Sequence, residues 1–183
     1  MLFAKNDGTV WITGFFNGTS YDTPTQVAIP GSVPIVGVAA GNDSSYAWAA
    51  DGRLYAWGSN LAGEVGNGTQ QSVATPLQVV VPGGVAKVAT ETKTVLAATK
   101  LGEVYGWGEV DTRNMFGVES NSGDVALVPT KVPGIATAVD VAVGQFHFLA
   151  RKSDNTLISW GGDFFTEALG RDADVTTPAW VPS

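Results

Sequence analysis

The sequence of 183 residues contains no cysteine and few charged residues, with 10 basic side chains against 17 acidic ones. The lack of cysteine excludes disulfides, thiolate zinc sites and cysteine nucleophiles. The net charge of −7 has the wrong sign for binding a phosphate backbone, so we expect no nucleic-acid partner. A solvated acidic surface that favours solubility is the simpler explanation of this charge.

Long apolar runs are also absent. The N-terminal segment MLFAKNDGTV has no basic stretch ahead of an apolar run, so it does not resemble a signal peptide. No stretch of the chain approaches the roughly 18 apolar residues of a membrane-spanning helix. We therefore expect a soluble protein without a membrane span, in the cytoplasm or in a virion, and the sequence itself does not decide between compartments.

Glycine and apolar residues are abundant instead. The chain has 23 glycines and 44% hydrophobic residues, and the glycine share is nearly twice the usual value of about 7%. The short segments 45–50 and 53–57 are apolar on both faces, which is typical of strands that are covered on both sides. No window of ten or more residues has a convincing helical period. The sequence predicts an all-β fold with little or no helix.

A tryptophan followed at once by a glycine recurs three times, in LYAWGSN (54–60), VYGWGEV (104–110) and LISWGGD (157–163). Tyr55 and Trp57 share one face of a strand. A large ring at the same place in every unit, followed by a residue without a side chain, is suited to wedging stacked sheets together. We therefore interpret these tryptophans as repeated structural elements and not as separate ligand contacts.

A turn precedes each of these glycines by six residues. Its second position is Gly52, Gly102 or Asn155, and a fourth copy at the start of the chain has Gly8 there but Thr13 in place of the tryptophan. Glycine and asparagine are the residues that best tolerate a positive φ, which predicts a hairpin with a left-handed residue.

Further motifs keep the same register, among them a proline-containing segment such as TPTQV or TPLQV near the end of each copy. Self-similarity at a fixed period indicates a repeat architecture. We predict one domain over residues 1–183, made of the units 1–34, 35–84, 85–137 and 138–183, of which the first is incomplete because it lacks the strand that opens the others.

These motifs together resemble the regulator of chromosome condensation repeat family, and residues 35–68, IVGVAAGNDSSYAWAADGRLYAWGSNLAGEVGNG, fit best. The resemblance implies a β-propeller with blades of about four antiparallel strands. Family members usually have about seven repeats, so four units predict an open arc that another copy, another chain or a following segment completes. A compact ring of four blades is the alternative.

No catalytic, metal or cofactor site is expected. The only histidine, His147, stands at the histidine position of the family repeat, where it would serve the turn and the packing. The carboxylates Asp163, Glu167, Asp172 and Asp174 are close in sequence, but their spacing matches no calcium loop. The sequence also has no plausible Ser/His/Asp constellation.

Paired aromatic residues in loops of the terminal units are the candidate interaction residues. They are Phe15 with Phe16, and Phe164 with Phe165. Aromatic anchors dominate protein interfaces, but the same side chains would equally serve as caps of the terminal blades. Trp180 is a further candidate. A carbohydrate-binding surface would use Trp48 and Trp180, which we expect to be exposed, or the phenylalanine loops.

The function that the sequence favours is a non-enzymatic protein–protein interaction scaffold that associates with itself or with another protein. The family resemblance permits guanine-nucleotide exchange on a small GTPase, but no residue pattern here supports it. Two alternatives remain from the sequence: a structural component of a virion surface or an adhesive fibre, and a carbohydrate-binding module.

Overall fold

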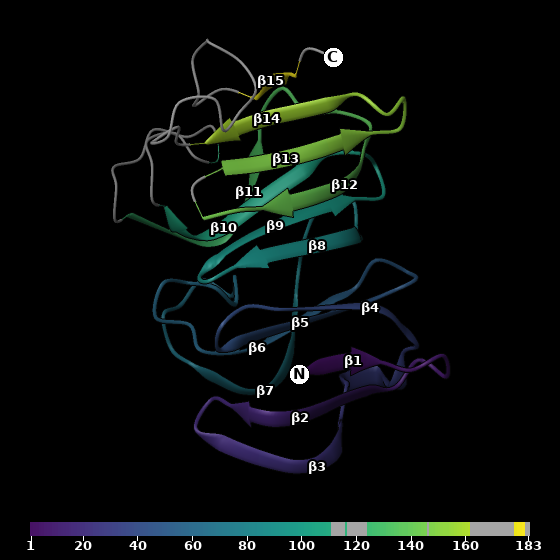
Figure 1. The fold of residues 1–183 in the computed structure, drawn as a ribbon, viewed down its shortest axis with the longest axis vertical. Helices are drawn as coiled ribbons and strands as arrows, with labels where there is room; N and C mark the ends of the chain where they lie inside the picture. The colour runs from purple at the N-terminus through teal and green to yellow at the C-terminus, as the bar shows by residue number, and fades with distance from the viewer. Residues whose placement is uncertain (111–115, 117–123, 146, 162–177, 182–183) are drawn as a thin grey trace.

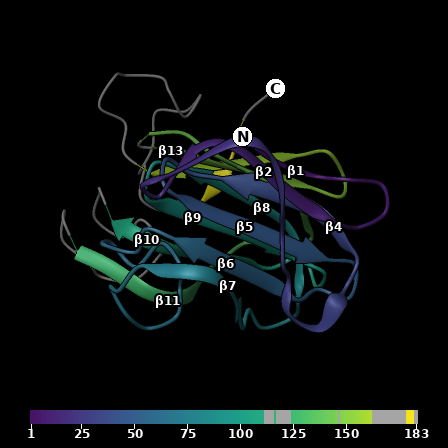
Figure 2. The same cartoon turned by 90° about the horizontal axis from the view of Figure 1, so that it is seen from below.

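The structure is a computed structural model that describes residues 1–110, 116, 124–145, 147–161 and 178–181 (Figure 1). The described residues form four antiparallel sheets and one 3-10 turn, η1 (Pro30–Ser32), with no α-helix among them. The predicted all-β fold is confirmed. Each sheet is a meander in which strands that follow one another in sequence are hydrogen-bonded neighbours. Figure 2 shows β5 (Ser44–Ala49), β6 (Leu54–Gly58) and β7 (Val73–Val79) of one such sheet side by side.

We call the four sheets blades 1 to 4. Blade 1 has three strands, β1 (Leu2–Ala4), β2 (Val10–Phe16) and β3 (Thr19–Val27). Blade 2 consists of β4 (Ile35–Ala40), β5 (Ser44–Ala49), β6 (Leu54–Gly58) and β7 (Val73–Val79). Blade 3 consists of β8 (Val85–Glu91), β9 (Thr94–Thr99), β10 (Val104–Val110) and β11 (Asp124–Val132). Blade 4 consists of β12 (Ala138–Val143), β13 (His147–Lys152), β14 (Leu157–Gly161) and β15 (Ala179–Trp180).

The blades follow one another along the longest axis of the molecule, with blade 1 at one end and blade 4 at the other (Figure 1). The opening strands of blades 2, 3 and 4 contact one another in turn, β4 with β8 and β8 with β12. These strands therefore line the inner side of an open arc. In blade 1 the corresponding strand is missing, as the sequence predicts, because β1 pairs with β2 in the way that β5 pairs with β6.

Backbone hydrogen bonds join each blade to the next at the hairpin turn. In every case the carbonyl of the turn glycine accepts a hydrogen bond from the N–H of the residue that begins the opening strand of the next blade. The bonds are Ile35 to Gly8 (3.0 Å), Val85 to Gly52 (2.8 Å) and Ala138 to Gly102 (2.9 Å). The repeat therefore propagates by backbone geometry as well as by side-chain packing.

The predicted left-handed residues occupy these turns. Gly8, Gly52 and Gly102 have φ of 81°, 97° and 79°, and Asn155 has φ of 67° in the last turn. Asparagine is the residue that replaces glycine there at the lowest steric cost.

The three tryptophans occupy equivalent positions between successive blades, which confirms their predicted structural role. Trp57, Trp107 and Trp160 are all buried, and each packs against the preceding blade. In blades 2 and 3 the register of the sheet shifts at the residue pair around the tryptophan, between Ala56 and Gly58 and between Gly106 and Gly108. The bulge directs the ring into the interface between blades, and the following glycine lets the chain pass close to the neighbouring strand.

Candidate functional site

The loop 59–72, between β6 and β7, closes the interface of blades 2 and 3. Asn60 is fully buried and holds the loop together: its Nδ2 donates to the carbonyls of Thr69 (2.8 Å) and Gln71 (3.1 Å), and its Oδ1 accepts from the N–H of Val65 (2.8 Å). The Oε2 of the buried Glu64 accepts from the N–H of Ala62 at 2.7 Å. The loop is therefore a folded plug and not an open connection.

The plug contacts both blades through one carbonyl oxygen. Glu64 O accepts hydrogen bonds from Trp107 Nε1 (2.7 Å) and from the hydroxyl of Tyr46 (2.8 Å). Val65 is fully buried beside these rings, and Tyr46 meets Trp107 edge-on, with centroids 6.4 Å apart. Burial raises the pKa of Tyr46, so its hydroxyl remains a donor. Sequence reasoning missed this contact, although the motif NLAGEVG in residues 60–66 was its signal.

The two phenylalanines of the first unit have different environments. Phe15 is 75% exposed, whereas Phe16 is half-buried and packs against the cluster of blades 1 and 2. A Cβ atom at Gly58 would lie 2.9 Å from Phe16 Cζ, so the ring lies directly against blade 2. Phe15 is therefore the member of the pair that is available to a partner. Phe164 and Phe165 lie outside the described residues.

The two tryptophans considered for carbohydrate binding also differ. Trp180 is 53% exposed on β15, at the outer edge of blade 4. Trp48 was expected to be exposed, and this expectation is wrong: it is 6% exposed, because it lies in the core cluster between blades 2 and 3 and covers Gly37.

The face of blade 4 that points away from blade 3 is partly exposed among the described residues, although Ser159 on this face is buried. Phe148 and Ala150 point toward blade 3, so Leu149, between them on β13, points away from it. Leu157 is 40% exposed beside it, and the two leucines line a hollow of about 210 Å³. By strand register, Leu157 corresponds to Leu54, which is 1% exposed because blade 3 covers it.

Asp140 in the hollow on blade 4 forms ion pairs with Arg151 and with Lys87 of blade 3. Arg151 Nη2 lies 3.7 Å from Asp140 Oδ2, and both side chains are more than two-fifths exposed. No residue in the described part of the chain donates a hydrogen bond to the carbonyl of Asn155, the position that corresponds to the turn glycines of the other blades. Blade 4 therefore presents both the face and the carbonyl that blades 1 to 3 use to hold their successors.

The opposite face, on blade 1, carries partly exposed aromatic side chains. Trp11 stands at the register position of Tyr55, and Phe3 is its cross-strand neighbour. The ammonium of Lys5 lies 4.9 Å from the centroid of the Trp11 ring, and the indole N–H donates to Thr9 Oγ1 at 2.9 Å. These contacts tie the Trp11 ring to Lys5 and Thr9 of its own blade.

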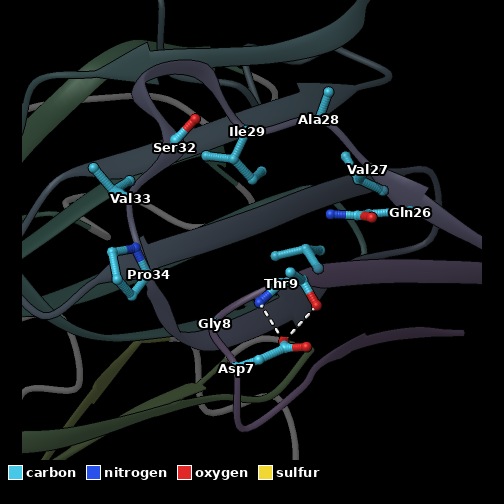
Figure 3. A pocket seen from close by; sticks show the side chains of 11 residues that line it. Asp7, Gly8, Thr9, Gln26, Val27, Ala28, Ile29, Ser32, Val33 and Pro34 are labelled. Carbon is cyan, nitrogen blue, oxygen red and sulfur yellow. Dashed lines mark hydrogen bonds between the residues drawn. The ribbon is translucent and has the colours of Figure 1, made fainter.

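A pocket of about 360 Å³ lies beside the first hairpin, between the start of β2, the end of β3 and the segment that leads to blade 2 (Figure 3). Asp7 is the only ionisable residue among the described residues that line it. Its Oδ1 accepts from the N–H (3.0 Å) and the hydroxyl (2.6 Å) of Thr9. The carboxylate is thus engaged in the turn, and the pocket contains no pair of groups suited to acid–base chemistry.

Catalytic and metal chemistry have no other support in the described residues. His147 lies at the start of β13, and a Cβ atom at Gly144 would lie 2.5 Å from its Cε1, so the imidazole packs on the turn as expected. No group of three His, Asp or Glu residues in the described part of the chain is placed to hold a metal ion. Asp163, Glu167, Asp172 and Asp174 lie outside the described residues. No helix in the described part is long and apolar enough to cross a membrane.

Aspartates in three of the four hairpin turns share one hydrogen-bonding pattern. Asp7, Asp51 and Asp154 each accept a hydrogen bond from the N–H of the residue two positions later. The Thr156 hydroxyl and N–H, with Lys152, lower the pKa of Asp154 from 3.8 to about 2. Hydrogen bonds to the charged form favour that form, and the pKa values of Asp7 and Asp51 are lowered for the same reason.

These turns make the free energy of unfolding depend on pH in the acidic range. A carboxylate whose pKa is lower in the folded than in the unfolded chain stabilises the fold fully above the unfolded pKa of 3.8, and this contribution is lost as the pH falls toward about 2. We expect the free energy of unfolding of the Asp154→Asn variant to fall less steeply over this range than that of the original protein. Urea unfolding at several pH values measures the difference, and parallel curves would contradict the assignment.

The architecture defines a repeat protein of the β-propeller class, and comparison with known proteins identifies the repeat. Residues 51–91 match one model of the regulator of chromosome condensation (RCC1) repeat, and residues 35–64 and 138–166 match a second model of that repeat. The chain carries RCC1 repeats, as its sequence motifs indicated.

Curated relatives support the same assignment. The chain is 32% identical over 152 residues to the human E3 ubiquitin-protein ligase HERC2, 28% identical over 182 residues to protein pim1 of Schizosaccharomyces pombe and 27% identical over 191 residues to RUG3 of Arabidopsis thaliana. The matches cover 81%, 88% and 96% of this chain, but only 3%, 33% and 42% of those proteins. The chain thus spans less than half the length of these relatives, and their activities do not carry over to it by similarity.

Solved structures show the same fold. Human WBSCR16 superposes with a TM-score of 0.79 at 18% identity, covering 99% of this chain and 49% of that one. Prp20p of Saccharomyces cerevisiae superposes with a TM-score of 0.66 at 18% identity, covering 100% of this chain and 61% of that one. The four blades therefore correspond to about half of each of these larger structures.

Proposed function

We propose that this protein is a non-catalytic scaffold whose uncovered terminal faces bind another protein, in the simplest case a second copy of the chain. The observation that carries the proposal is the face of blade 4. Leu149 and Leu157 stand where the other blades bury their contact residues, and the carbonyl of Asn155 is placed to accept the hydrogen bond that starts a following blade. An apolar sheet face of this kind is stabilised when another sheet covers it.

The partner would be a protein because the face continues an interface that already recurs in the fold. Three times in this chain, a sheet of the same design covers the face of its predecessor. Similar structures have been described with protein partners: Prp20 has been solved bound to Kap60, and the Prp20p structure was described together with its binding to Gsp1p and histones. Of the described candidates, Phe15 and Trp180 are exposed at the two ends of the arc and would extend such contacts.

The oligomeric state tests this proposal. We expect the mass in solution to rise with concentration, and we expect Leu157→Asp to weaken self-association by roughly tenfold or more, because a charge would be buried in an apolar interface. Leu101→Asp is the matched control, since Leu101 is 71% exposed on a hairpin turn away from this face. Sedimentation equilibrium measures both variants. A monomer at every concentration would contradict association with a second copy.

A carbohydrate-binding module and a structural component of a virion or fibre remain the alternatives that the sequence raised. Among the described residues, the carbohydrate alternative would depend on the exposed Trp180.

A further inference from the structure

The interface between blades 1 and 2 contains a cavity. It has a volume of about 390 Å³ and is lined by residues of β2, β3, β6 and β7, including Phe16, Tyr21, Trp57 and Thr75. No lining residue carries a formal charge at neutral pH. The cavity shares Gln26, Val27 and Ala28 with the pocket beside the first hairpin and extends from there toward the Asn17 turn that joins β2 to β3.

The origin of the cavity is a missing plug. Between blades 2 and 3, the loop 59–72 fills the corresponding space with Val65, and a Cβ atom at Gly66 would lie 2.9 Å from Trp107 Nε1. Between blades 3 and 4, the fully buried Phe116 lies 6.3 Å from Phe148 between ring centroids. In blade 1 the connection is reduced to the tight turn at Asn17 and Gly18, which brings the polar side chain of Asn17 to the lining of the cavity but no apolar side chain that fills it.

The missing plug leaves hydrogen-bonding groups without partners. Trp107 donates its indole N–H to Glu64 O, but no residue in the described part of the chain accepts from Trp57 Nε1. Ser45, directly across from Trp57 on β5, is 1% exposed, and its hydroxyl has no hydrogen-bond partner within the described chain. The equivalent positions in blades 3 and 4 are the apolar Val95 and Phe148. An unpaired buried polar group is costly, and Ser45 Oγ is such a group. The indole N–H of Trp57 is not buried in this sense: Trp57 lines the cavity, so its N–H is available to an occupant.

We propose that this cavity, which we call the Trp57 cavity, is a binding site for a loop of a partner protein. The loop would insert one uncharged apolar side chain between Phe16 and Trp57, and its preceding carbonyl would accept the hydrogen bond of Trp57 Nε1. This arrangement reproduces the contacts at Trp107, where Glu64 O accepts the indole hydrogen bond and Val65 packs in the same core cluster. The inference rests on the proposed role in protein binding, but it concerns a surface separate from the terminal faces.

The chemistry of the cavity favours a peptide as the occupant. In the described part of the chain, Val65 fills one of the two equivalent spaces and Phe116 lies in the other, and both side chains are apolar. A sugar would bring many hydroxyl groups to a cavity that is lined in part by the apolar side chains of Ile12, Phe16 and Val27. The amides of Asn17 and Gln26 and the hydroxyl of Thr25 lie around the cavity, where they would pair with the backbone of an entering loop.

A peptide with the sequence of residues 59–72 is the probe, because it is the plug of the next interface. We expect the indole N–H signal of Trp57 in a ¹⁵N-labelled sample, assigned with Trp57→Phe, to shift and saturate as this peptide is added. The same peptide carrying Val65→Asp should leave the signal unchanged. Thr75→Phe, which would fill the cavity, should abolish the shift. Val128→Phe is the matched control, because Val128 holds the equivalent position of β11, outside the cavity.

A grafted chain gives a second measurement that does not depend on the affinity of a free peptide. Residues 59–72 replace Asn17 and Gly18, and hydrogen exchange of the Trp57 indole N–H is compared in the two chains. We expect exchange to slow by roughly tenfold in the graft, but not in a graft that carries Val65→Asp. If neither the peptide nor the graft alters Trp57, the proposal is wrong. A shift caused by maltotriose and not by the peptide would also overturn it, in favour of a carbohydrate site. None of these results depends on the solution mass, which tests the terminal faces.

Discussion

Replacing Trp107 with alanine is expected to lower the free energy of unfolding by about 3–5 kcal/mol, the range for deleting a large buried aromatic side chain. Trp107 is fully buried, packs edge-on against Tyr46 and donates its indole N–H to Glu64 O at 2.7 Å. The substitution removes the ring, opens a cavity between blades 2 and 3, and leaves Glu64 O with the Tyr46 hydroxyl as its remaining donor. Urea or thermal unfolding measures the loss.

Trp180→Ala is the matched control, since it removes the same ring from a site that is 53% exposed. Its effect on stability should stay within about 0.5 kcal/mol, as for most surface substitutions. A native protein stabilised by only about 5–15 kcal/mol would lose a large fraction of its stability in the first variant and almost none in the second. Equal effects of the two substitutions would contradict a structural role for Trp107.

The repeated features of the fold were predictable because they depend on local chemistry. A turn that needs a positive φ requires glycine or asparagine, and Gly52 and Asn155 show this in the sequence before any contact is known. The alternation of Tyr55 and Trp57 likewise places both rings on one face of a strand. The incomplete first blade was also predictable, since the strand it lacks is absent from the sequence.

The features that distinguish one interface from another were not predictable. Whether Trp48 is exposed depends on blade 3, which covers it. Phe15 and Phe16 are adjacent and chemically identical, yet one is exposed and the other packs beside Gly58, because of the strand geometry around the bulge at Gly14. The short connection at Asn17 and Gly18 can be read from the sequence, but its consequence for Trp57 required the position of Glu64 relative to a tryptophan 43 residues away.

Replacing Gly108 with alanine is expected to lower the free energy of unfolding by about 3 kcal/mol or more, because backbone strain and a broken hydrogen bond add together. Gly108 has φ of 97°, and a Cβ atom there would lie 2.0 Å from the carbonyl oxygen of Lys93. That same oxygen accepts the N–H of Glu109 at 3.1 Å, so relief of the clash must break the bond that follows the bulge in β10.

The Gly134→Ala variant separates the cost of backbone strain from the cost of the steric clash and the broken hydrogen bond. Gly134 also has a positive φ, of 76°, but a Cβ atom there would have no neighbour within 4 Å. Its replacement should therefore cost only about 1–2 kcal/mol, the price of a left-handed backbone with a Cβ atom. Chemical unfolding of both variants measures the difference, which isolates the steric contact with Lys93. If the two costs were equal, the glycine after each tryptophan would be required for its φ alone, and the close approach of the neighbouring strand would contribute nothing. A larger cost at Gly108 would show that the Trp-Gly pair acts as one unit, in which the ring fills the interface and the glycine admits the strand beside it.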